Sequence, residues 1–187
     1  MKKYKILHVT DMHFRHFGRL FYSTGKKINN GLILNGHNVL QISDRDEIHK
    51  VKSLFDLGGS KKLYNTIEKN IENFKPDLIL FGHVDRLDGE KLINLKTKYN
   101  SIKFSQWFLD PLITDGPDFL KNKNRFFSKY QFCDTNFITT APSALNFVDT
   151  KKTFFIPNPI DKSIDIYRNF DAKKIIDVFI PISHGQH

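Results

Sequence analysis

Residues Asp77-Leu-Ile-Leu-Phe81 form a short apolar run that lies between Pro76 and Gly82. Because its last four positions are all apolar, both faces of a strand formed here would be buried, which is typical of a parallel sheet. The apolar residues before Pro76 recur at helical spacing: Leu63, Ile67, Ile71 and Phe74. A helix followed directly by a doubly buried strand indicates the βαβ connections of an α/β protein.

The same alternation of strands and helices continues along the chain. Apolar runs predict further strands at residues 5–10, 38–42, 102–106, 136–139 and 153–156. Helices are expected from Ser23 or Thr24 to Gly36, over 60–74, over 88–99, up to about Tyr130, and briefly at Pro142. This pattern predicts an α/β fold of the Rossmann-like, doubly wound class, with a parallel sheet in the order 3-2-1-4-5-6 and the first helix packed on its first two strands.

Ligands of such sheets bind beyond the carboxyl ends of the strands, so the loops that follow the strands are where a site is expected. These loops cover residues 11–20, 43–46, 82–87, 107–111, 140–143 and 157–161.

The last part of the sequence predicts a change of domain. Residues 1–161 read as one α/β domain, which closes with Thr153-Phe-Phe-Ile-Pro-Asn-Pro-Ile-Asp161. Another apolar run, Asp177-Val-Phe-Ile-Pro-Ile182, follows just before the end. We therefore expect residues 162–187 to be an interdomain crossing and the first strand of a truncated second domain.

The composition narrows the class of protein. One cysteine, Cys133, excludes an internal disulfide framework and fits a reducing compartment, and no apolar run is long enough for a membrane span or a signal peptide. We therefore expect a cytoplasmic protein. The net charge of +9 would suit an anionic partner, but the lysines are scattered pairs on predicted helix faces. This scatter argues against nucleic acid and leaves a peripheral contact with an anionic membrane surface as a possible role.

The segment Asp11-Met-His13, which follows the first predicted strand, is a candidate for chemistry. A carboxylate and an imidazole two residues apart can bind one metal, and calcineurin-like metallophosphoesterases begin their two-metal site in this way. Such a site needs further ligands, and neither Gly82-His83-Val-Asp85 nor His184 matches its later motifs. We therefore expect no metal site, and a phosphoesterase built on Asp11 and His13 is kept as an alternative.

The chain lacks the glycine pattern of a dinucleotide site. The first loop holds Gly18, but the next glycines are Gly25 and Gly31, so there is no Gly-x-Gly-x-x-Gly turn. Asp44 ends the second predicted strand, where a ribose-binding acid would stand, but alone it reads as a surface aspartate. No cofactor is therefore predicted.

Several histidines lie near the expected ligand edge. His13 and His16 belong to the first loop, and His83 directly follows the strand at 77–81, so each could be structural or functional. His8 lies inside the first strand and can be a core residue. His37 follows a helix end, where an interaction with the helix C-terminus is expected.

The segment Trp107-Phe-Leu-Asp110-Pro111 is expected as the loop after the fourth strand. An acid beside large aromatic rings can orient a sugar hydroxyl while the rings offer a stacking face. The same sequence also suits a turn in which Asp110 precedes Pro111. Both interpretations stay open.

Taken in order, five segments resemble the N-terminal domain of GT-B glycosyltransferases, nearest to the group 1-like subgroup that contains the CgeB-like proteins. The resemblance covers residue 6 to about residue 161. The segments that carry it are Ile6-Leu-His-Val-Thr with His16-Phe-Gly-Arg19, Leu34-Asn-Gly-His-Asn-Val39, Lys75-Pro-Asp-Leu-Ile-Leu80, Trp107-Phe-Leu-Asp110 and Ile156-Pro-Asn-Pro-Ile-Asp161.

The resemblance implies the acceptor half of an enzyme that moves a sugar from a nucleotide-sugar donor to an acceptor hydroxyl, such as one on a cell-envelope glycan. The donor would be held mostly by the missing domain, so this chain alone would be inactive. His83 and Asp110 would be catalytic. Substrate-binding roles are implied for His13, His16, Gly18, Arg19, Trp107 and Asn158, with Arg19 near the donor phosphates. A non-catalytic sugar- or nucleotide-binding module is the remaining alternative.

Overall fold

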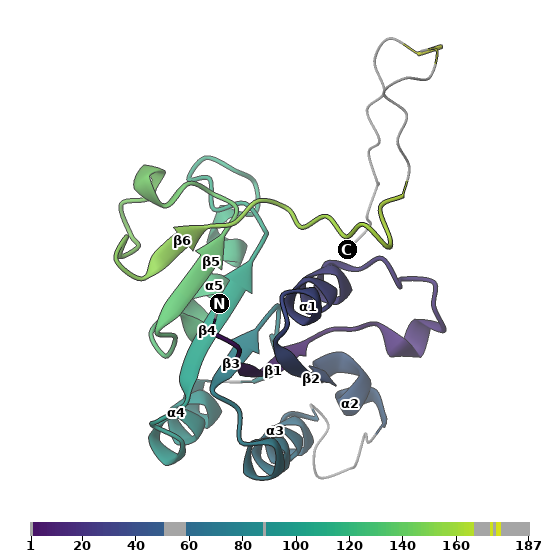
Figure 1. The fold of residues 1–187 in the computed structure, drawn as a ribbon. Helices are drawn as coiled ribbons and strands as arrows, with labels where there is room; N and C mark the ends of the chain where they lie inside the picture. The colour runs from purple at the N-terminus through teal and green to yellow at the C-terminus, as the bar shows by residue number, and fades with distance from the viewer. Residues whose placement is uncertain (1, 51–58, 88, 167–172, 174, 177–187) are drawn as a thin grey trace.

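The computed structural model describes residues 2–50, 59–87, 89–166, 173 and 175–176, and these form an α/β fold with a parallel sheet. The predicted Rossmann-like, doubly wound class is confirmed, because every neighbouring pair of strands is parallel and helices cover both faces (Figure 1). The strands are β1 (Lys5–Thr10), β2 (Asn38–Ser43), β3 (Leu78–Phe81), β4 (Lys103–Phe108), β5 (Thr135–Ile138) and β6 (Thr153–Phe155).

The predicted strand order, 3-2-1-4-5-6, is wrong. The observed order is β2-β1-β3-β4-β5-β6, in which β3 lies directly beside β1 with Val9 opposite Phe81. The chain leaves β1 toward β2 and then returns across β1 to form β3. A strand that is apolar on both faces is best buried near the middle of the sheet, and β3 lies there. The connections therefore reverse direction between β1 and β3, which is where open α/β sheets bind ligands.

The two faces of the sheet are covered by different helices. Helix α1 (Thr24–Leu34) lies on one face, where Ile28 and Leu32 pack against Ile6 and Leu80. This confirms the expected place of the first helix. The other face is covered by α3 (Ser60–Phe74), α4 (Gly89–Lys98) and α5 (Phe119–Tyr130). The core on this face is the larger of the two. Strand residues such as Phe104 pack there against the predicted apolar positions of α3.

Two short 3-10 helices, η1 (Phe14–His16) and η2 (Pro142–Ala144), lie in loops, and η2 confirms the short helix expected at Pro142. A further helix, α2 (Asp44–Lys50), directly follows β2. The prediction of a loop at residues 43–46 was therefore wrong. Six of its seven residues are charged or histidine, so the helix has no apolar stripe that the sequence could reveal.

The tryptophan segment also differs from its prediction. Trp107 and Phe108 belong to β4 and not to the loop after it, and Trp107 is only 5% exposed. Its indole Nε1 donates to Nε2 of His8 over 3.1 Å. His8 is fully buried, so its expected core role is confirmed, and its Nδ1 lies 3.4 Å from Oδ1 of Asn29 on α1. Burial lowers the pKa of His8 to about 4, which keeps this linking ring neutral.

The histidine at the end of α1 behaves as expected. The backbone nitrogen of His37 donates to the oxygen of Leu32 over 3.2 Å, at the C-terminal end of the helix. Its ring Nδ1 accepts a hydrogen bond from the backbone nitrogen of Tyr4 over 3.2 Å. Gly36, whose φ is 82°, turns the chain between the end of α1 and His37. The structural role of His37 is therefore confirmed, but only its backbone contacts the helix end, and its ring binds Tyr4 instead.

After β6 the chain crosses to α1 (Figure 1). Asp161 accepts a hydrogen bond from Nδ2 of Asn30 over 2.6 Å, and Asp165 is paired with Nζ of Lys27 over 2.6 Å. The first residues of the expected crossing are thus tied to α1. The strand expected at 177–182 lies outside the described residues. Across the described part of the chain, none of the helices combines the length and apolarity needed to span a bilayer.

The core on the α3 side is expected to hold the fold together. Replacing Phe104, which is fully buried and lies with its ring centroid 5.6 Å from that of Phe81, by alanine should lower the free energy of unfolding by about 3–5 kcal/mol, because it leaves a cavity. The matched change Phe154→Ala, at a side chain that is 44% exposed, should cost less than about 1 kcal/mol. Urea unfolding followed by circular dichroism measures both. Equal losses would contradict this account of the core.

Candidate functional site

A cleft opens where β1, β3 and β4 end and α1 begins. It has a volume of about 240 Å³, and we call it the His83 cleft. Its lining residues are Thr10, Asp11, His13, Ser23, Thr24, Gly25, Arg45, His83, Trp107, Leu109 and Asp110. The site therefore lies at the reversal between β1 and β3, the place that the sheet topology favours.

Two glycines let the walls of the His83 cleft come close together. A Cβ on Gly82 would lie 2.3 Å from Oγ1 of Thr10 and 2.4 Å from the indole of Trp107. A Cβ on Gly25 would lie 2.8 Å from Cγ2 of Thr10. Any larger residue at Gly82 would push the β3 loop away from β1, so this glycine sets the position of His83.

His83 is held as a neutral ring. It stacks on Phe108 with ring centroids 4.8 Å apart and an angle of 17°. Nε2 accepts from the backbone nitrogen of Leu109 over 3.4 Å, while Nδ1 lies 3.1 Å from Nη2 of Arg125 and 3.6 Å from Oδ2 of Asp110. A neutral ring can accept at only one of its two nitrogens. Burial lowers the pKa of His83, Arg125 lowers it further, and the opposing effect of Asp110 is smaller than that of burial. A neutral imidazole at this place can accept a proton.

Arg125, on α5, fixes the groups around His83. Its Nη1 donates to Oδ2 of Asp110 over 2.6 Å, while Nε and Nη2 donate to the two oxygens of Asp85 over 3.2 and 3.1 Å. One side chain thus joins the loop after β3 to the loop after β4. The sequence analysis missed Arg125, because it lies inside a helix and far along the chain from the residues it binds.

Asp11 and His13 lie close together, but the carboxylate of Asp11 is already bound by Arg15. Both oxygens of Asp11 accept from Arg15 over 2.9 Å, and His13 Nδ1 lies 3.3 Å from Oδ2. Burial alone would raise the pKa of Asp11, but the hydrogen bonds from Arg15 and from the backbone of His13 lower it. Arg15 also binds Asp46 over 3.1 Å. Nowhere in the described ranges do three His, Cys, Asp or Glu side chains group as metal ligands would.

The structure brings together some of the predicted site residues. His13, His83, Trp107 and Asp110 line the His83 cleft. The others lie outside its lining: the ring centroid of His16 is 5.6 Å from that of His13, Gly18 and Arg19 are exposed in the loop after η1, and Asn158 is exposed after β6. The functional roles of all these residues stay predictions.

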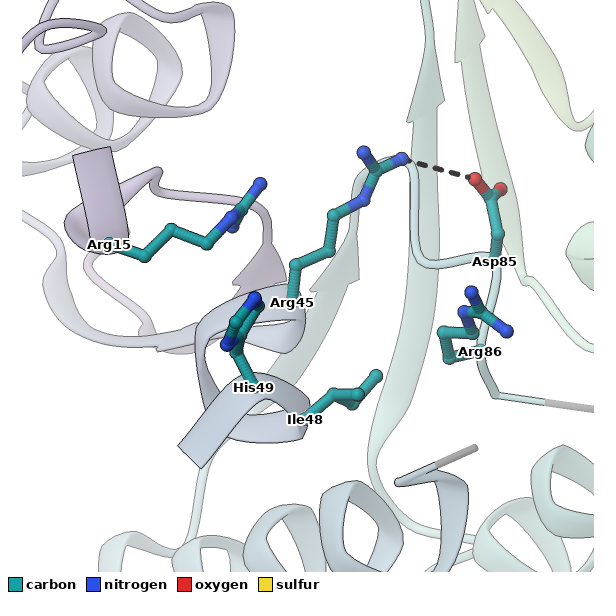
Figure 2. A pocket seen from close by; sticks show the side chains of 6 residues that line it. All are labelled: Arg15, Arg45, Ile48, His49, Asp85 and Arg86. Carbon is teal, nitrogen blue, oxygen red and sulfur yellow. Dashed lines mark hydrogen bonds and ion pairs between the residues drawn. The ribbon is translucent and has the colours of Figure 1, made fainter. Parts of the chain in front are cut away.

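A second hollow, of about 570 Å³, adjoins the His83 cleft, because Arg45 lines both. Figure 2 shows its lining side chains, and we call it the arginine cavity. The residues are Arg15, Arg45, Ile48, His49, Asp85 and Arg86, contributed by η1, α2 and the loop after β3. The sequence analysis missed all three arginines, since they are distant in sequence and only the strand order brings them together.

Asp44 is not the surface residue that the sequence suggested. It is fully buried at the start of α2, and within the described ranges neither carboxylate oxygen makes a hydrogen bond of good geometry. Burial raises the pKa of Asp44 to about 7, with Asp11 and Asp85 adding to the effect. The prediction failed because α2, which covers this position, was not foreseen.

Asp44 should therefore make stability depend on pH. The folded protein keeps this proton up to about pH 7, whereas the unfolded chain loses it near 3.8, so ionisation of Asp44 weakens the fold as pH rises between these values. The variant Asp44→Asn cannot titrate. Its free energy of unfolding, relative to that of the original protein, should rise by about 2 kcal/mol between about pH 5.5 and pH 8. Urea unfolding at both pH values measures this difference, and a difference independent of pH would contradict it.

Comparison of the chain with models of known protein families gives no match, and comparison with curated proteins gives none either. The residues of the His83 cleft, the arginine cavity and the fold that positions them are what a functional assignment has to rest on.

Proposed function

We propose that this chain is the acceptor-binding half of a GT-B-type glycosyltransferase, and that acceptor and donor sugar meet in the His83 cleft. The observation that supports it best is the convergence of His13, His83, Trp107 and Asp110 on one cleft. The resemblance assigns these residues to one site, although Trp107 lies in β4 and the other three lie in the loops after β1, β3 and β4. Their meeting at the carboxyl edge of the sheet is what a shared site requires.

The proposed reaction forms a bond between an acceptor oxygen and the anomeric carbon of the donor and breaks the bond from that carbon to the leaving phosphate. The neutral ring of His83 can take the acceptor's proton or contact the reacting sugar. Asp110, whose Oδ2 is held by Arg125, can orient the acceptor hydroxyl through its other oxygen. The arginines of the site favour the charge that develops on the leaving phosphate.

The second domain, of which residues 162–187 would be the start, would supply most contacts to the donor nucleotide. The crossing from Asp161 to Asp165 is bound to α1, so that domain would meet the cleft from the α1 side. We place the protein in the cytoplasm, where Cys133 would stay reduced. Contact with an anionic membrane is also proposed, through Phe17 and Phe21, which are 97% and 60% exposed beside Arg19.

One observation favours a second candidate, a non-catalytic sugar-binding module. Arg125 already engages both Nδ1 of His83 and Oδ2 of Asp110, which reduces the capacity of these two groups for proton transfer. Trp107, the one tryptophan of the sequence, lines the cleft wall and would report sugar binding through its fluorescence.

Turnover separates these two functions. In the protein that carries this domain together with its nucleotide-binding domain, His83→Ala should lower the release of nucleoside diphosphate from a nucleotide sugar by about 10²- to 10⁴-fold. The KM for the donor should change little, because the nucleotide is held elsewhere. The control His37→Ala, at the opposite edge of the sheet, should be as active as the original protein. Unchanged turnover in His83→Ala would remove His83 from the chemistry.

If a panel of nucleotide sugars gives no transfer while free sugars still change the fluorescence of Trp107, the binding module is the function. The 187-residue chain alone should neither transfer a sugar nor bind a nucleotide sugar tightly.

A further inference from the structure

Arg45 is only weakly paired with carboxylates. Its Nε lies 3.6 Å from Asp11 and its Nη2 lies 3.5 Å from Asp85, both longer than a good charged hydrogen bond. Each of these carboxylates is already paired at shorter range, Asp11 with Arg15 at 2.9 Å and Asp85 with Arg125 at 3.1 Å. Arg45 is also 48% exposed. Its guanidinium therefore has donors left for a ligand.

Arg86 is a second such cation in the same cavity. Among the residues that the structure describes, its guanidinium has no hydrogen-bond or ion-pair partner, although the backbone oxygen of Arg86 accepts from Ser60. In Figure 2, Arg86 lies with Asp85 on one side of Arg45, and Arg15 lies on the other. His49 lies below them on α2 and offers a further ring donor. The cavity thus presents more positive than negative groups to whatever enters it.

We propose that the arginine cavity binds the phosphate group of a phosphorylated acceptor, such as a sugar phosphate, while the acceptor hydroxyl reaches the His83 cleft. A planar guanidinium suits a phosphate, which can accept two parallel hydrogen bonds from it. The volume of about 570 Å³ is of the size that holds a small organic ligand. This inference rests on the proposed function and names the substrate class of that site.

The position of the cavity favours the acceptor over the donor. It lies between α2 and the loop after β3, whereas the crossing segment is bound to α1 on the other side of the His83 cleft. A donor held by a second domain would enter from the α1 side. Because Arg45 lines both hollows, a phosphate in the cavity would place the rest of the same molecule in the cleft.

Calorimetry on the 187-residue chain tests this with four probes: glucose 6-phosphate, glucose, inorganic pyrophosphate and uridine diphosphate. Glucose 6-phosphate should bind at least about 10-fold more tightly than glucose, because only it carries the charge. Arg45→Gln and Arg86→Gln should each weaken the binding of glucose 6-phosphate about 10-fold or more. Lys121→Gln, which removes one positive charge at a 63% exposed position on α5, is the charge-matched control and should have no effect. Thermal melting should show that all variants fold.

Several results would overturn the inference. Equal affinity for glucose and glucose 6-phosphate would show that the phosphate is not recognised. Equal losses in Lys121→Gln and Arg86→Gln would show attraction by net charge alone. Uridine diphosphate binding more than about 10-fold tighter than pyrophosphate, and dependent on Arg45, would make the cavity part of the donor site.

The outcomes for the two proposals can be told apart. If glucose 6-phosphate binds in an arginine-dependent way but no sugar is transferred, the phosphate site is supported and the transferase proposal is contradicted. Transfer to neutral and phosphorylated acceptors at equal rates would keep the transferase and overturn the phosphate site.

Discussion

The carboxyl edge of the sheet can form only if its negative charges are balanced. Asp11, Asp46, Asp85 and Asp110 gather there because the strands that precede them are parallel and in register. Three arginines from three different segments supply the balance, at distances from 2.6 to 3.6 Å. Charge pairs that are partly shielded from water are stronger than those in open solvent. The positions of η1, α2 and α5 around the edge therefore depend on these arginine–carboxylate pairs.

The arginines are not all paired equally with these carboxylates, and this difference leaves donors that a ligand can use. Arg15 and Arg125 make short contacts with carboxylates, whereas Arg45 and Arg86 keep free donors among the residues that the structure describes. A few polar groups with free bonding capacity in a hollow are what a ligand site needs. Burial raises the pKa of Asp44, at the start of α2, to about 7, so this carboxyl carries only about half of a full negative charge near neutral pH. The cavity stays attractive to an anion although carboxylates surround it.

Sequence reasoning found the elements that carry an apolar pattern. The strand at 78–81, the helix with Leu63, Ile67 and Ile71, and the core position of His8 all follow from which residues must be buried. It could not find α2, because a short helix of mostly charged residues is fixed by its contacts with the rest of the fold. It also misplaced β3, since the order of parallel strands depends on where the connections cross, and periodicity does not report this.

The same limit applied to the site. Residues directly after strands could be predicted, and His13, His83 and Asp110 lie in the cleft as the strand-end rule expects. Arg125 could not, because it reaches the site from the middle of a helix. The arginine cavity needed the true strand order: with β3 beside β1, the loops that hold Arg15 and Arg86 and the helix that holds Arg45 share one edge. Three cations scattered over the sequence thus became neighbours through a topological feature that no local pattern encodes.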